Sequence, residues 1–466
     1  MVSPARRFRR GILIFTGAVF LVLSGLSGYA ADQKTDMRLT IREAVEKALA
    51  DNHAIKAVKS GLAAGRQDIG IARSYLLPKI SLEERYLRTN TPGYAFMSKL
   101  NQSRIAAADF NPDFLNSPEA INDYQSSIAV EQPIFVKKAL VGLEMSRTES
   151  LAKEEDVRRK EEEIAFSVVR ACLSVLTAGE YVQVAELGVR DARERLRIAE
   201  LRYKNDVGQY ADALRTATSL TEARQKLNVA RKNVSLARRA LGVLLALPDS
   251  PDVVDAAFDL SLQELTFYTA SAEKRADVRA LELRGENARN NIRLAEAGYF
   301  PYVGVGGSYQ FNDHNAPLGS EGKSWQVMAF VRWDLFDGTK REYERAKAKH
   351  QEAQVREHLA AMKKSVSFQI YEAYLNVGEA RQNIALAEEA LKTAEEGARL
   401  LKLRYENGLS SLSDLLNTQA SLEQARAGVV ETKNAYKTAL AGLHFESGTL
   451  LQNLKNGQSR PLGEKP

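Results

Sequence analysis

The sequence contains few of the residues from which catalytic and metal-binding sites are built. It has one cysteine, Cys172, and five histidines, and no histidine has a partner at metal-ligand spacing on a helix or in a Cys/His cluster. A single cysteine excludes an intrachain disulfide, and its position inside a long predicted helix indicates a buried structural thiol. We therefore expect no enzyme activity, no metal site and no cofactor.

The sequence also lacks any long block of charge of one sign. The net charge is +6, but residues 1–30 hold four arginines and no acidic residue, so the rest of the chain is nearly balanced. Charged segments such as 153–163 mix both signs at helical spacing, as an exposed coiled-coil face does. This mixture argues against a nucleic-acid partner, and the 44% of hydrophobic residues argues against disorder.

One apolar run suggests a targeting segment, and it lies at the start of the chain. Gly11 to Leu26 follows the arginines, and the small residues Gly28 and Ala30 come next, which predicts a signal peptide at residues 1–30 with cleavage after Ala30. An uncleaved anchor helix is the alternative, but the run is shorter than the roughly 20 residues that a spanning helix needs. The mature chain should therefore cross the inner membrane, without a lipid anchor because no cysteine is near.

The most informative feature present is an apolar ladder that occurs twice, 202 residues apart. The first copy runs from Ile164 to Tyr203 and the second from Val366 to Tyr405, with steps alternating between four and three residues. A 3.5-residue repeat sustained over so many turns predicts long coiled-coil helices. Shorter ladders predict that each returns antiparallel. The predicted long helices are 137–204 and 339–405, and the return helices are 212–247 and 411–445.

The shift of 202 residues predicts an internal duplication. Each repeat should open with an ordinary helix, 40–77 in the first and 272–298 in the second, and each helix ends at a proline, Pro78 or Pro301. The predicted bounds are 31–250 for the first repeat, 251–272 for a connector, 273–446 for the second repeat and 447–466 for a C-terminal tail.

Four segments alternate between apolar and polar residues with period two, at 79–88, 123–134, 302–312 and 324–336. About ten residues suits a tilted membrane-spanning strand, and aromatic residues gather near the ends as they do at membrane interfaces. A soluble sandwich with one buried face explains the alternation equally well, but explains the aromatic ends less well. The predicted aromatic belts consist of Tyr299, Tyr302, Tyr309, Phe311, Trp325, Trp333 and Phe336.

The two repeats differ in length between their strands. The offset between equivalent residues is 223 at the prolines and 201 at the later strand ends, so the first repeat has 22 extra residues. They must lie between Thr89 and Asn122, a segment rich in proline and asparagine. We expect an exposed loop there.

A polar turn joins each long helix to its return helix. In the second repeat Gly408 can end one helix, and Ser410, Ser411 or Ser413 can cap the next. Asp414 suits the dipole of that next helix. In the first repeat Asp206 occupies the glycine position and Gly208 follows two residues later, so that turn should bend differently. The residues expected at the tip are Asn205, Asp206, Gly208, Asn407, Gly408, Ser410 and Ser411.

With these features the chain resembles the TolC-type outer membrane factors. The resemblance rests on the signal peptide, the duplicated layout of helix, strands and long helices, the segment Trp333–Gly338, and the Tyr-x-x-Gly turn followed by Asp-Leu-Leu. It implies an α+β membrane protein in which a homotrimer forms a 12-stranded β-barrel, four strands per subunit, continued by a long antiparallel α-helical barrel. It also implies a periplasmic adaptor (membrane fusion) protein and an inner-membrane pump as partners.

The resemblance implies a gate at the helical tip. Asp414 matches the acidic constriction residue and Tyr405 the aromatic residue beside it, while Asp212 is the equivalent acid of the first repeat, for which helix capping is an equal alternative. A second acidic ring expected one turn beyond Asp414 falls on Asn417, which departs from the family pattern. We expect a passive export duct in outer membrane lipid, with its helical barrel in the periplasm. The alternative is a secreted structural or adhesive coiled-coil protein.

Overall fold

The computed structural model describes residues 37–254 and 260–456. The predicted signal peptide, residues 1–30, lies outside the described residues, as do part of the connector and the end of the tail. All elements below belong to the compact unit that starts at Arg38.

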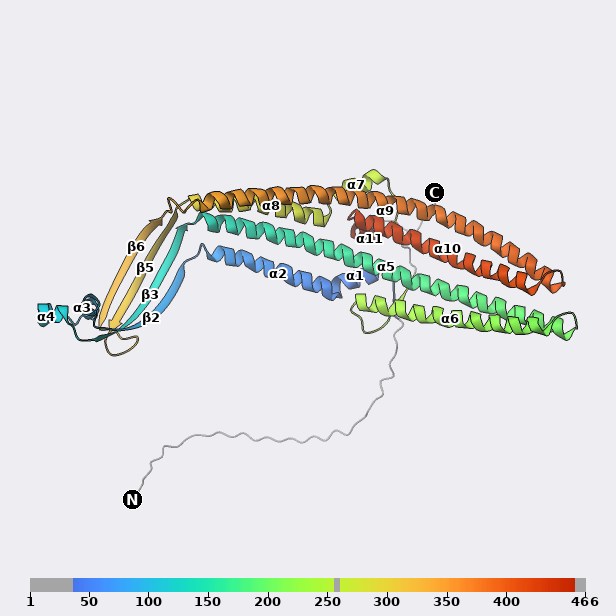
Figure 1. Ribbon diagram of the computed structural model, residues 1–466, viewed down its shortest axis with the longest axis horizontal. Coiled ribbons are helices and arrows are strands. Elements are labelled where there is room, and N and C mark those ends of the chain that lie inside the picture. The colour runs from blue at the N-terminus through green and yellow to red at the C-terminus, as the bar shows by residue number, and fades with distance from the viewer. Residues whose placement is uncertain (1–36, 255–259, 457–466) are drawn as a thin grey trace, which may run out of the picture. The chain divides into compact units, whose positions relative to one another are not determined.

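Two long helical hairpins make up most of this unit. In the first, α5 (Lys137–Lys204) turns into α6 (Tyr210–Leu244), and in the second, α9 (Lys340–Glu406) turns into α10 (Leu412–Glu446) (Figure 1). At 1.5 Å per residue, α5 and α9 are each about 100 Å long. All four helices begin and end within three residues of the predicted bounds, because the 3.5-residue ladder marks their packed faces.

Small side chains hold the helices of each hairpin close together. In the first hairpin Val189 and Ala192 of α5 pack against Leu220 and Ala223 of α6, and all four are buried. Alternating large and small residues along the ladder allow this interdigitation. Among the described helices, only α5 is long and apolar enough to cross a membrane by length and composition, a test that core helices also pass.

Shorter helices lie along the long ones, and their bounds differ from the prediction. The helix expected at 40–77 is two helices, α1 (Ile41–Asp51) and α2 (His53–Ser74). Asn52 breaks it with an extended backbone, while its side chain accepts from the amide of Ala54 at 2.8 Å and donates to the carbonyl of Leu244 at 2.8 Å. The side chain of Asn52 thus caps α2 and ties it to the end of α6.

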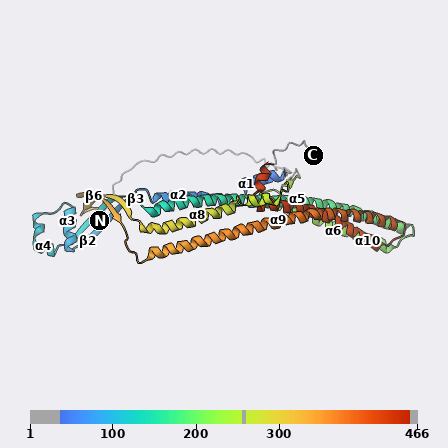
Figure 2. The same ribbon diagram turned by 90° about the horizontal axis from the view of Figure 1, so that it is seen from above.

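The opening of the second repeat is also divided. The helix expected at 272–298 begins later, because α7 (Leu265–Ala272) precedes α8 (Ala276–Glu296) and a short 3-10 turn, η2 (Ala297–Tyr299), follows. Figure 2 shows α2 and α8 running beside the long helices toward the strands, and α2 packs on α5 while α8 packs on both α5 and α9.

The four predicted strands form one antiparallel sheet in the order β2-β3-β5-β6. The bounds of the strands are Lys79–Thr89 for β2, Ile121–Phe135 for β3, Tyr302–Asp313 for β5 and Gly322–Arg332 for β6. β6 therefore ends four residues before the predicted end, and Trp333 and Phe336 follow the strand. Within the described residues the outer edges of β2 and β6 have no strand beside them.

The register gives the sheet one apolar and one polar face. Leu82, Ile128, Tyr309 and Trp325 lie side by side in one row across the strands. The neighbouring row on the opposite face is polar and consists of Glu83, Ser127, Gln310 and Ser324. The apolar face is uncovered, since the exposed fraction is 69% for Leu82 and 73% for Trp325.

The segment between β2 and β3, which we expected to be an exposed loop, is largely exposed but contains short helices. It contains α3 (Pro92–Asn101), the 3-10 helix η1 (Ala107–Phe110) and α4 (Pro112–Asn116). Proline at the first helical position favours α3 and α4. Ser98 of α3 and Gln102, its C-cap residue, donate to the buried carboxylate of Asp123 at 3.1 and 2.9 Å, so α3 is tied to the start of β3.

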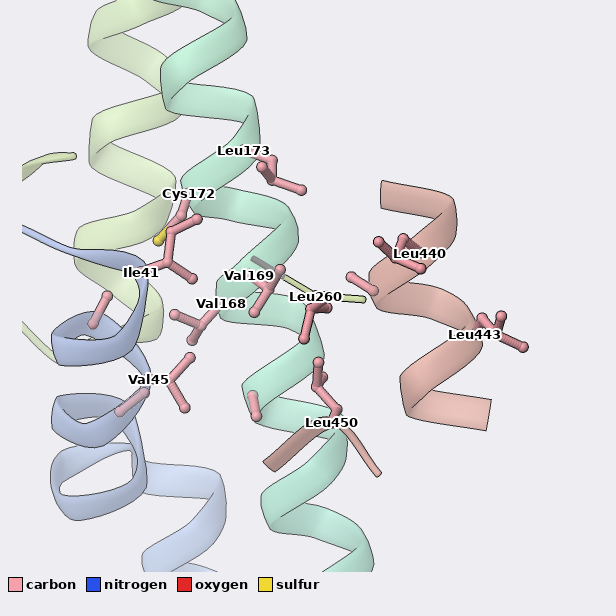
Figure 3. Packing of buried hydrophobic residues seen from close by; sticks show 14 of the residues in the cluster. Ile41, Val45, Val168, Val169, Cys172, Leu173, Leu260, Leu440, Leu443 and Leu450 are labelled. Atoms are coloured by element: carbon pink, nitrogen blue, oxygen red, sulfur yellow. The ribbon is translucent and has the colours of Figure 1, made fainter. Parts of the chain in front are cut away.

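The main hydrophobic core lies where α1, α5, α10 and α11 (Leu450–Asn456) meet, midway along the long helices (Figure 3). Beside it β1 (Arg38–Leu39) pairs in parallel with β4 (Asp252–Val253). Cys172 is fully buried in this core, and burial raises the pKa of its thiol to about 12. The thiol is therefore protonated and packs as a small apolar side chain.

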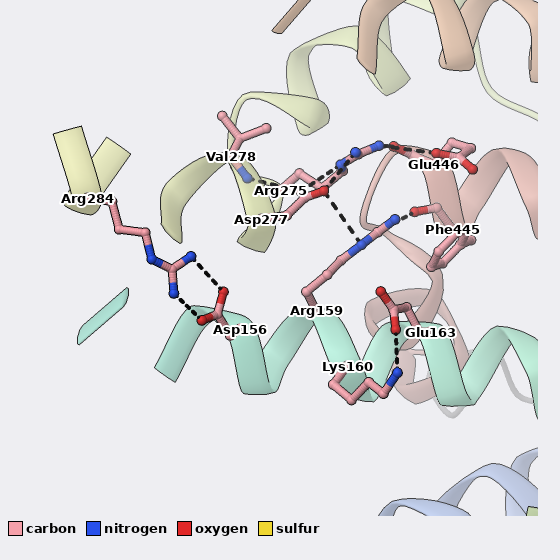
Figure 4. A network of polar contacts seen from close by, with 10 residues as sticks. All are labelled: Asp156, Arg159, Lys160, Glu163, Arg275, Asp277, Val278, Arg284, Phe445 and Glu446. Carbon is pink, nitrogen blue, oxygen red and sulfur yellow. Dashed lines mark hydrogen bonds and ion pairs between the residues drawn. The ribbon is translucent and has the colours of Figure 1, made fainter. Parts of the chain in front are cut away.

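A polar network fastens the second repeat to α5 at the same level (Figure 4). Arg275, just before α8, donates to Asp277 at 2.8 Å and to the carbonyl of Glu446 at 2.9 Å. The Arg159 guanidinium lies 4.1 Å from the ring centre of Phe445 and donates to its carbonyl at 3.3 Å. Since both arginines are paired in a partly buried setting, this junction should be rigid.

Candidate functional site at the helical turns

The two turns at the far ends of the hairpins have the same backbone. The amide of Asp206 donates to Tyr203 at 3.1 Å, and the amide of Gly408 donates to Tyr405 at 3.0 Å. Both residues adopt the left-handed conformation, with φ of 57° for Asp206 and 75° for Gly408. The first turn therefore does not bend differently at this position, because aspartate can adopt the conformation that glycine supplies in the second turn.

Gly208 is required for a different reason than the sequence suggested. Its φ is not positive, but a Cβ atom there would lie 2.8 Å from Cβ of Arg202. Glycine thus lets the chain pass close to the end of α5. The equivalent residue of the second turn is Ser410, whose hydroxyl donates to the carbonyl of Leu401 at 3.5 Å.

Asp414 takes part in the cap of α10, for which Ser411 is the N-cap residue. Its carboxylate accepts from the amide of Ser411 at 3.4 Å and from the hydroxyl of Ser411 at 2.7 Å, and its own amide donates to that hydroxyl at 3.1 Å, which completes a capping box. Asp414 and Asn417 are both exposed on the same side of α10, one turn apart. The cap uses one carboxylate oxygen, so the charge of Asp414 remains at the surface of the tip.

Asp212 does not cap its helix, although it occupies the equivalent position. The residue that begins α6, Gln209, makes no side-chain cap. Instead the carboxylate of Asp212 accepts from the hydroxyl of Tyr405, in the other hairpin, at 3.4 Å. Asp414 therefore makes its hydrogen bonds within its own turn, whereas Asp212 makes a hydrogen bond to the other turn.

Tyr405 is the most buried of the predicted tip residues, with an exposed fraction of 2%. It packs with Leu412 and Leu415 of its own turn and with Ile198 of α5. Burial and the nearby carboxylate of Asp212 raise the pKa of the Tyr405 hydroxyl. The hydroxyl is thus neutral and can donate its proton to Asp212.

Arg202, to which the sequence gave no role, joins the two turns. It donates to the carbonyls of Tyr405 and of Glu406, the latter at 3.1 Å, and to the carbonyl of Val207 in its own turn at 3.0 Å. Its guanidinium also lies 5.0 Å from the ring centre of Tyr405. The sequence contains the same Arg-Tyr pair at the start of both turns. The apolar periodicity alone does not show what the arginine of this pair contacts.

The other predicted tip residues lie on the outside of the turns. Asn205 and Asn407 end α5 and α9, and the side-chain amide of Asn407 donates to the carbonyl of Leu403 at 2.8 Å. Further along the hairpins, Asp191 of α5 pairs with Arg426 of α10 at 2.8 Å. These contacts hold the first hairpin against α10 above the tip.

A groove of about 660 Å³ lies between α5, α6 and α10, farther from the tip. Many of its lining residues are small, among them Ala178, Gly188, Ala223 and Ala427.

The predicted aromatic belt residues fall into three groups. Tyr309, Phe311 and Trp325 lie on the apolar face of the sheet. Tyr302 lies on the polar face instead, where its hydroxyl donates to Glu131 at 2.9 Å. The third group surrounds the junction of strands and helices and consists of Tyr299, Trp333 and Phe336, with the indole of Trp333 donating to the carbonyl of Tyr299 at 3.2 Å.

His314 has acidic neighbours that the sequence spacing did not reveal. Its Nδ1 lies 2.6 Å from a carboxylate oxygen of Glu321, in the link between β5 and β6. Asp313 lies beside them, and its carboxylate accepts from the amides of Asn315 and Ala316. These contacts order the link, and we assign no metal to them.

Comparisons with known proteins agree with this arrangement. The family model described as outer membrane efflux protein matches residues 44–247 and 268–449. The alkaline protease secretion protein AprF of Pseudomonas aeruginosa is 21% identical over 408 residues, which cover 83% of this chain and 80% of AprF. The outer membrane efflux protein BepC of Brucella suis is 22% identical over 291 residues, which cover 62% of this chain and 58% of BepC.

The fold is also similar to solved channel structures. The open state of the MtrE outer membrane channel of Neisseria gonorrhoeae aligns with a TM-score of 0.71 at 17% identity, covering 88% of this chain and 89% of that one. Because the family model covers most of the chain, the protein belongs to the outer membrane efflux protein family, and it is an outer membrane channel of efflux or secretion.

Proposed function

We propose that three copies of the chain form one passive export duct, with a closed 12-stranded barrel in the membrane and the helical hairpins in the periplasm. The observation that carries this proposal is the four-stranded sheet with an exposed apolar face and two unpaired edges. An open edge leaves backbone groups without hydrogen bonds, which costs several kcal/mol for each group in lipid. Closure with further copies removes both edges.

The strand directions favour this closure. Neighbours in the sheet are antiparallel throughout, so β6 of one copy and β2 of the next run in opposite directions. They can therefore pair antiparallel like every other pair in the sheet. The row of Leu82 and Trp325 then faces lipid, and the row of Glu83 and Gln310 faces the lumen. Three copies are what the resemblance to the TolC-type channels implies.

We also propose that the chain consists of two repeats that arose by internal duplication. The two matched ranges of the family model, 44–247 and 268–449, coincide with the two hairpins and their strands, which supports it. Each subunit then contributes two similar hairpins, and three subunits contribute six to the helical barrel.

The helical turns are the proposed gate. In a trimer three copies of Asp414 surround the axis, and like charges that meet there attract cations and repel anions. Tyr405, Asp212 and Asn417 complete the proposed constriction. The structure of MtrE in an open state supports a gate that opens and closes in channels of this fold.

The energy for export comes from partners, since a passive duct performs no catalysis. We place a periplasmic adaptor at the exposed tip residues Asn205, Asp206, Gly208, Asn407, Gly408, Ser410 and Ser411, and an inner-membrane pump beneath it. The groove lined by Gly188 and Ala223 could accept a helix of the adaptor. The secreted coiled-coil alternative is set aside because the family model describes outer membrane channels.

The test uses purified full-length mature protein in detergent and in planar bilayers. We expect the native mass of a trimer and discrete conductance steps with preference for cations. Asp414→Asn removes the charge but keeps the size of the side chain, so it should reduce the cation preference. Glu396→Gln is the matched control, because Glu396 pairs only with Arg399 of its own helix. A monomeric native mass would contradict the proposed assembly. Equal cation preference in wild type and Asp414→Asn would contradict the proposed gate.

A further inference from the structure

Arg195 of α5 is a buried cation whose hydrogen-bonding capacity is not used. The exposed fraction of the residue is 5%, and its Nε and Nη1 atoms are buried without a hydrogen-bond partner among the described residues. An arginine side chain stays charged in proteins, and a buried charge is unfavourable unless another group balances it. The burial of Arg195 therefore calls for a source of negative charge.

The two carboxylates that attract Arg195 are already held by other cations. Asp191 accepts from Arg426 of α10 at 2.8 Å, and Glu423 accepts from Lys226 of α6 at 2.8 Å. Burial lowers the pKa of the Arg195 guanidinium, and the two carboxylates offset only part of this effect. The described residues thus leave the charge of Arg195 incompletely balanced.

The repeated ladder does not account for this arginine. Shifted by 202 residues, Arg195 corresponds to Gly397 of α9, so the second repeat has no cation at the equivalent position. The ladder residues beside Arg195, Ala192 and Leu196, correspond to Ala394 and Ala398 and are apolar in both repeats. The packing of long helices therefore does not require a charge here.

Arg195 lines a cavity of about 330 Å³ between α5, α9 and α10. Part of its wall consists of the buried apolar residues Ala398, Leu415 and Leu422. Since one water molecule takes up about 30 Å³ in the liquid, the cavity has room for an anion of several heavy atoms. Apolar walls lower the local dielectric constant and strengthen the attraction between a cation and an anion.

The charges around this cavity do not cancel. The charged residues that line it are Arg195, Arg399, Lys402, Arg426, Asp191, Glu194 and Glu395. Glu194 and Arg399 each pair with a residue three positions away on their own helix, outside the cavity, and Asp191 pairs with Arg426 inside it. Arg195 and Lys402 then remain with one acid, Glu395, which leaves an excess of one positive charge.

We propose that this cavity is a binding site for a small oxyanion, either a carboxylate or a phosphate. The guanidinium of Arg195 is the main ligand, because its planar donors match two oxygen atoms of one anion, and the ammonium of Lys402 adds a second positive charge. The site is built from residues of one chain, so it does not depend on the proposed trimer. A bound anion would connect α5 of the first hairpin with α9 of the second.

Equilibrium dialysis of the full-length mature protein in detergent tests this site. The probes are radiolabelled phosphate and radiolabelled succinate, each at constant ionic strength set with sodium chloride. We expect saturable binding that approaches one anion per chain, and the probe that binds more tightly identifies phosphate or carboxylate as the preferred group. Arg195→Gln should weaken binding at least about tenfold, since it removes a charged hydrogen-bond donor. Arg190→Gln is the matched control, because Arg190 is exposed on the same helix and does not line the cavity.

A second measurement uses the wild type alone and therefore does not depend on the folding of a variant. Crystals of the wild-type protein soaked in selenate should show anomalous scattering from selenium beside the guanidinium of Arg195. Selenate has the shape and charge of a tetrahedral oxyanion, and its selenium atom identifies its position.

Saturable binding of either probe that Arg195→Gln weakens and Arg190→Gln does not, together with selenium beside Arg195, would support the proposal. Absence of saturable binding, equal affinity in the wild type and both variants, or selenium only at other places would overturn it. Density for an acidic side chain of a neighbouring subunit inside the cavity would also overturn it, because that side chain would then balance Arg195.

Discussion

The first and second turns of this chain share one backbone but use equivalent side chains differently. Arg202 reaches across to the other hairpin, whereas Arg404 bonds only within its own turn. Asp212 accepts from Tyr405, whereas Asp414 caps its own helix. The difference shows that turns with the same backbone geometry make different contacts, because each turn has a different neighbour.

The largest effect should come from Arg202→Ala. It removes hydrogen bonds to the carbonyls of Tyr405 and Glu406 and the contact with the ring of Tyr405. Because Arg202 is partly exposed, we expect the closed gate to lose about 2 kcal/mol, which raises the ratio of open to closed channels roughly thirtyfold. Single-channel recording in planar bilayers measures this ratio.

The comparison becomes sharper with Arg404→Ala in the same recording. We expect a smaller rise, because the hydrogen bond of Arg404 to the carbonyl of Leu409 lies within its own turn and is long, at 3.4 Å. Arg399→Ala is the control on the same helix, as Arg399 pairs only with Glu396. Equal ratios for wild type and Arg202→Ala would show that the turns do not hold the channel closed.

Tyr405→Phe should have the next largest effect. It removes the hydrogen bond to Asp212 and keeps the packing with Leu412, so the cost is about 1 kcal/mol, or roughly fivefold in the ratio of open to closed channels. Tyr203→Phe is its partner variant and should change the ratio less, because the half-exposed ring of Tyr203 packs on Tyr210 of its own turn. A larger effect of Tyr203→Phe than of Tyr405→Phe on the ratio of open to closed channels would contradict this expectation.

The hydrogen bond of Tyr405 also predicts a dependence on pH. The pKa of this hydroxyl is raised in the closed turn by burial and by Asp212. Its contribution is therefore complete below about pH 10, the ordinary value, and is lost as the pH rises through the raised pKa. The open fraction of the wild type should rise only above pH 10, and Tyr405→Phe should not show this rise.

The smallest effect concerns the backbone that the turns share. Asp206 adopts the left-handed conformation at a cost that Gly408 avoids. Asp206→Gly should stabilise the first turn by up to about 1 kcal/mol, and Gly408→Asp should destabilise the second by a similar amount. Thermal unfolding of the trimer in detergent should shift in opposite directions for the two variants, and shifts of the same sign would contradict the shared geometry.

Local periodicity was enough to predict the helices and most of the strands. The ladder from Ile164 to Tyr203 located α5, because a packed seam repeats every 3.5 residues whatever its neighbours are. The break at Asn52 could not be predicted in this way, since no glycine or proline marks it and the partner carbonyl belongs to Leu244, distant in sequence. The predicted end of β6 was wrong, because the alternation of apolar and polar residues continues through Trp333, beyond the last residue that pairs with β5.

At the helical turns, too, the sequence did not predict contacts between segments that are distant in the chain. The sequence indicated Tyr405 and Asp212 as tip residues, but their hydrogen bond depends on how one hairpin docks on the other. Arg202 was visible as half of a repeated Arg-Tyr pair, and its role follows only from the carbonyls that the second turn presents. Pro92 and Pro112 stand at the starts of α3 and α4, a signal that our expectation of an exposed loop did not use.

The central claim is that contacts between helical turns close the duct. Single-channel conductance of the full-length trimer carrying both Arg202→Ala and Arg404→Ala tests it most directly, with the double variant of Arg197 and Arg399, which pair within their own helices, as control. The account predicts rare, small openings for wild type and control, and an open fraction higher by more than tenfold for the arginine double variant. The same open fraction in all three proteins would contradict it.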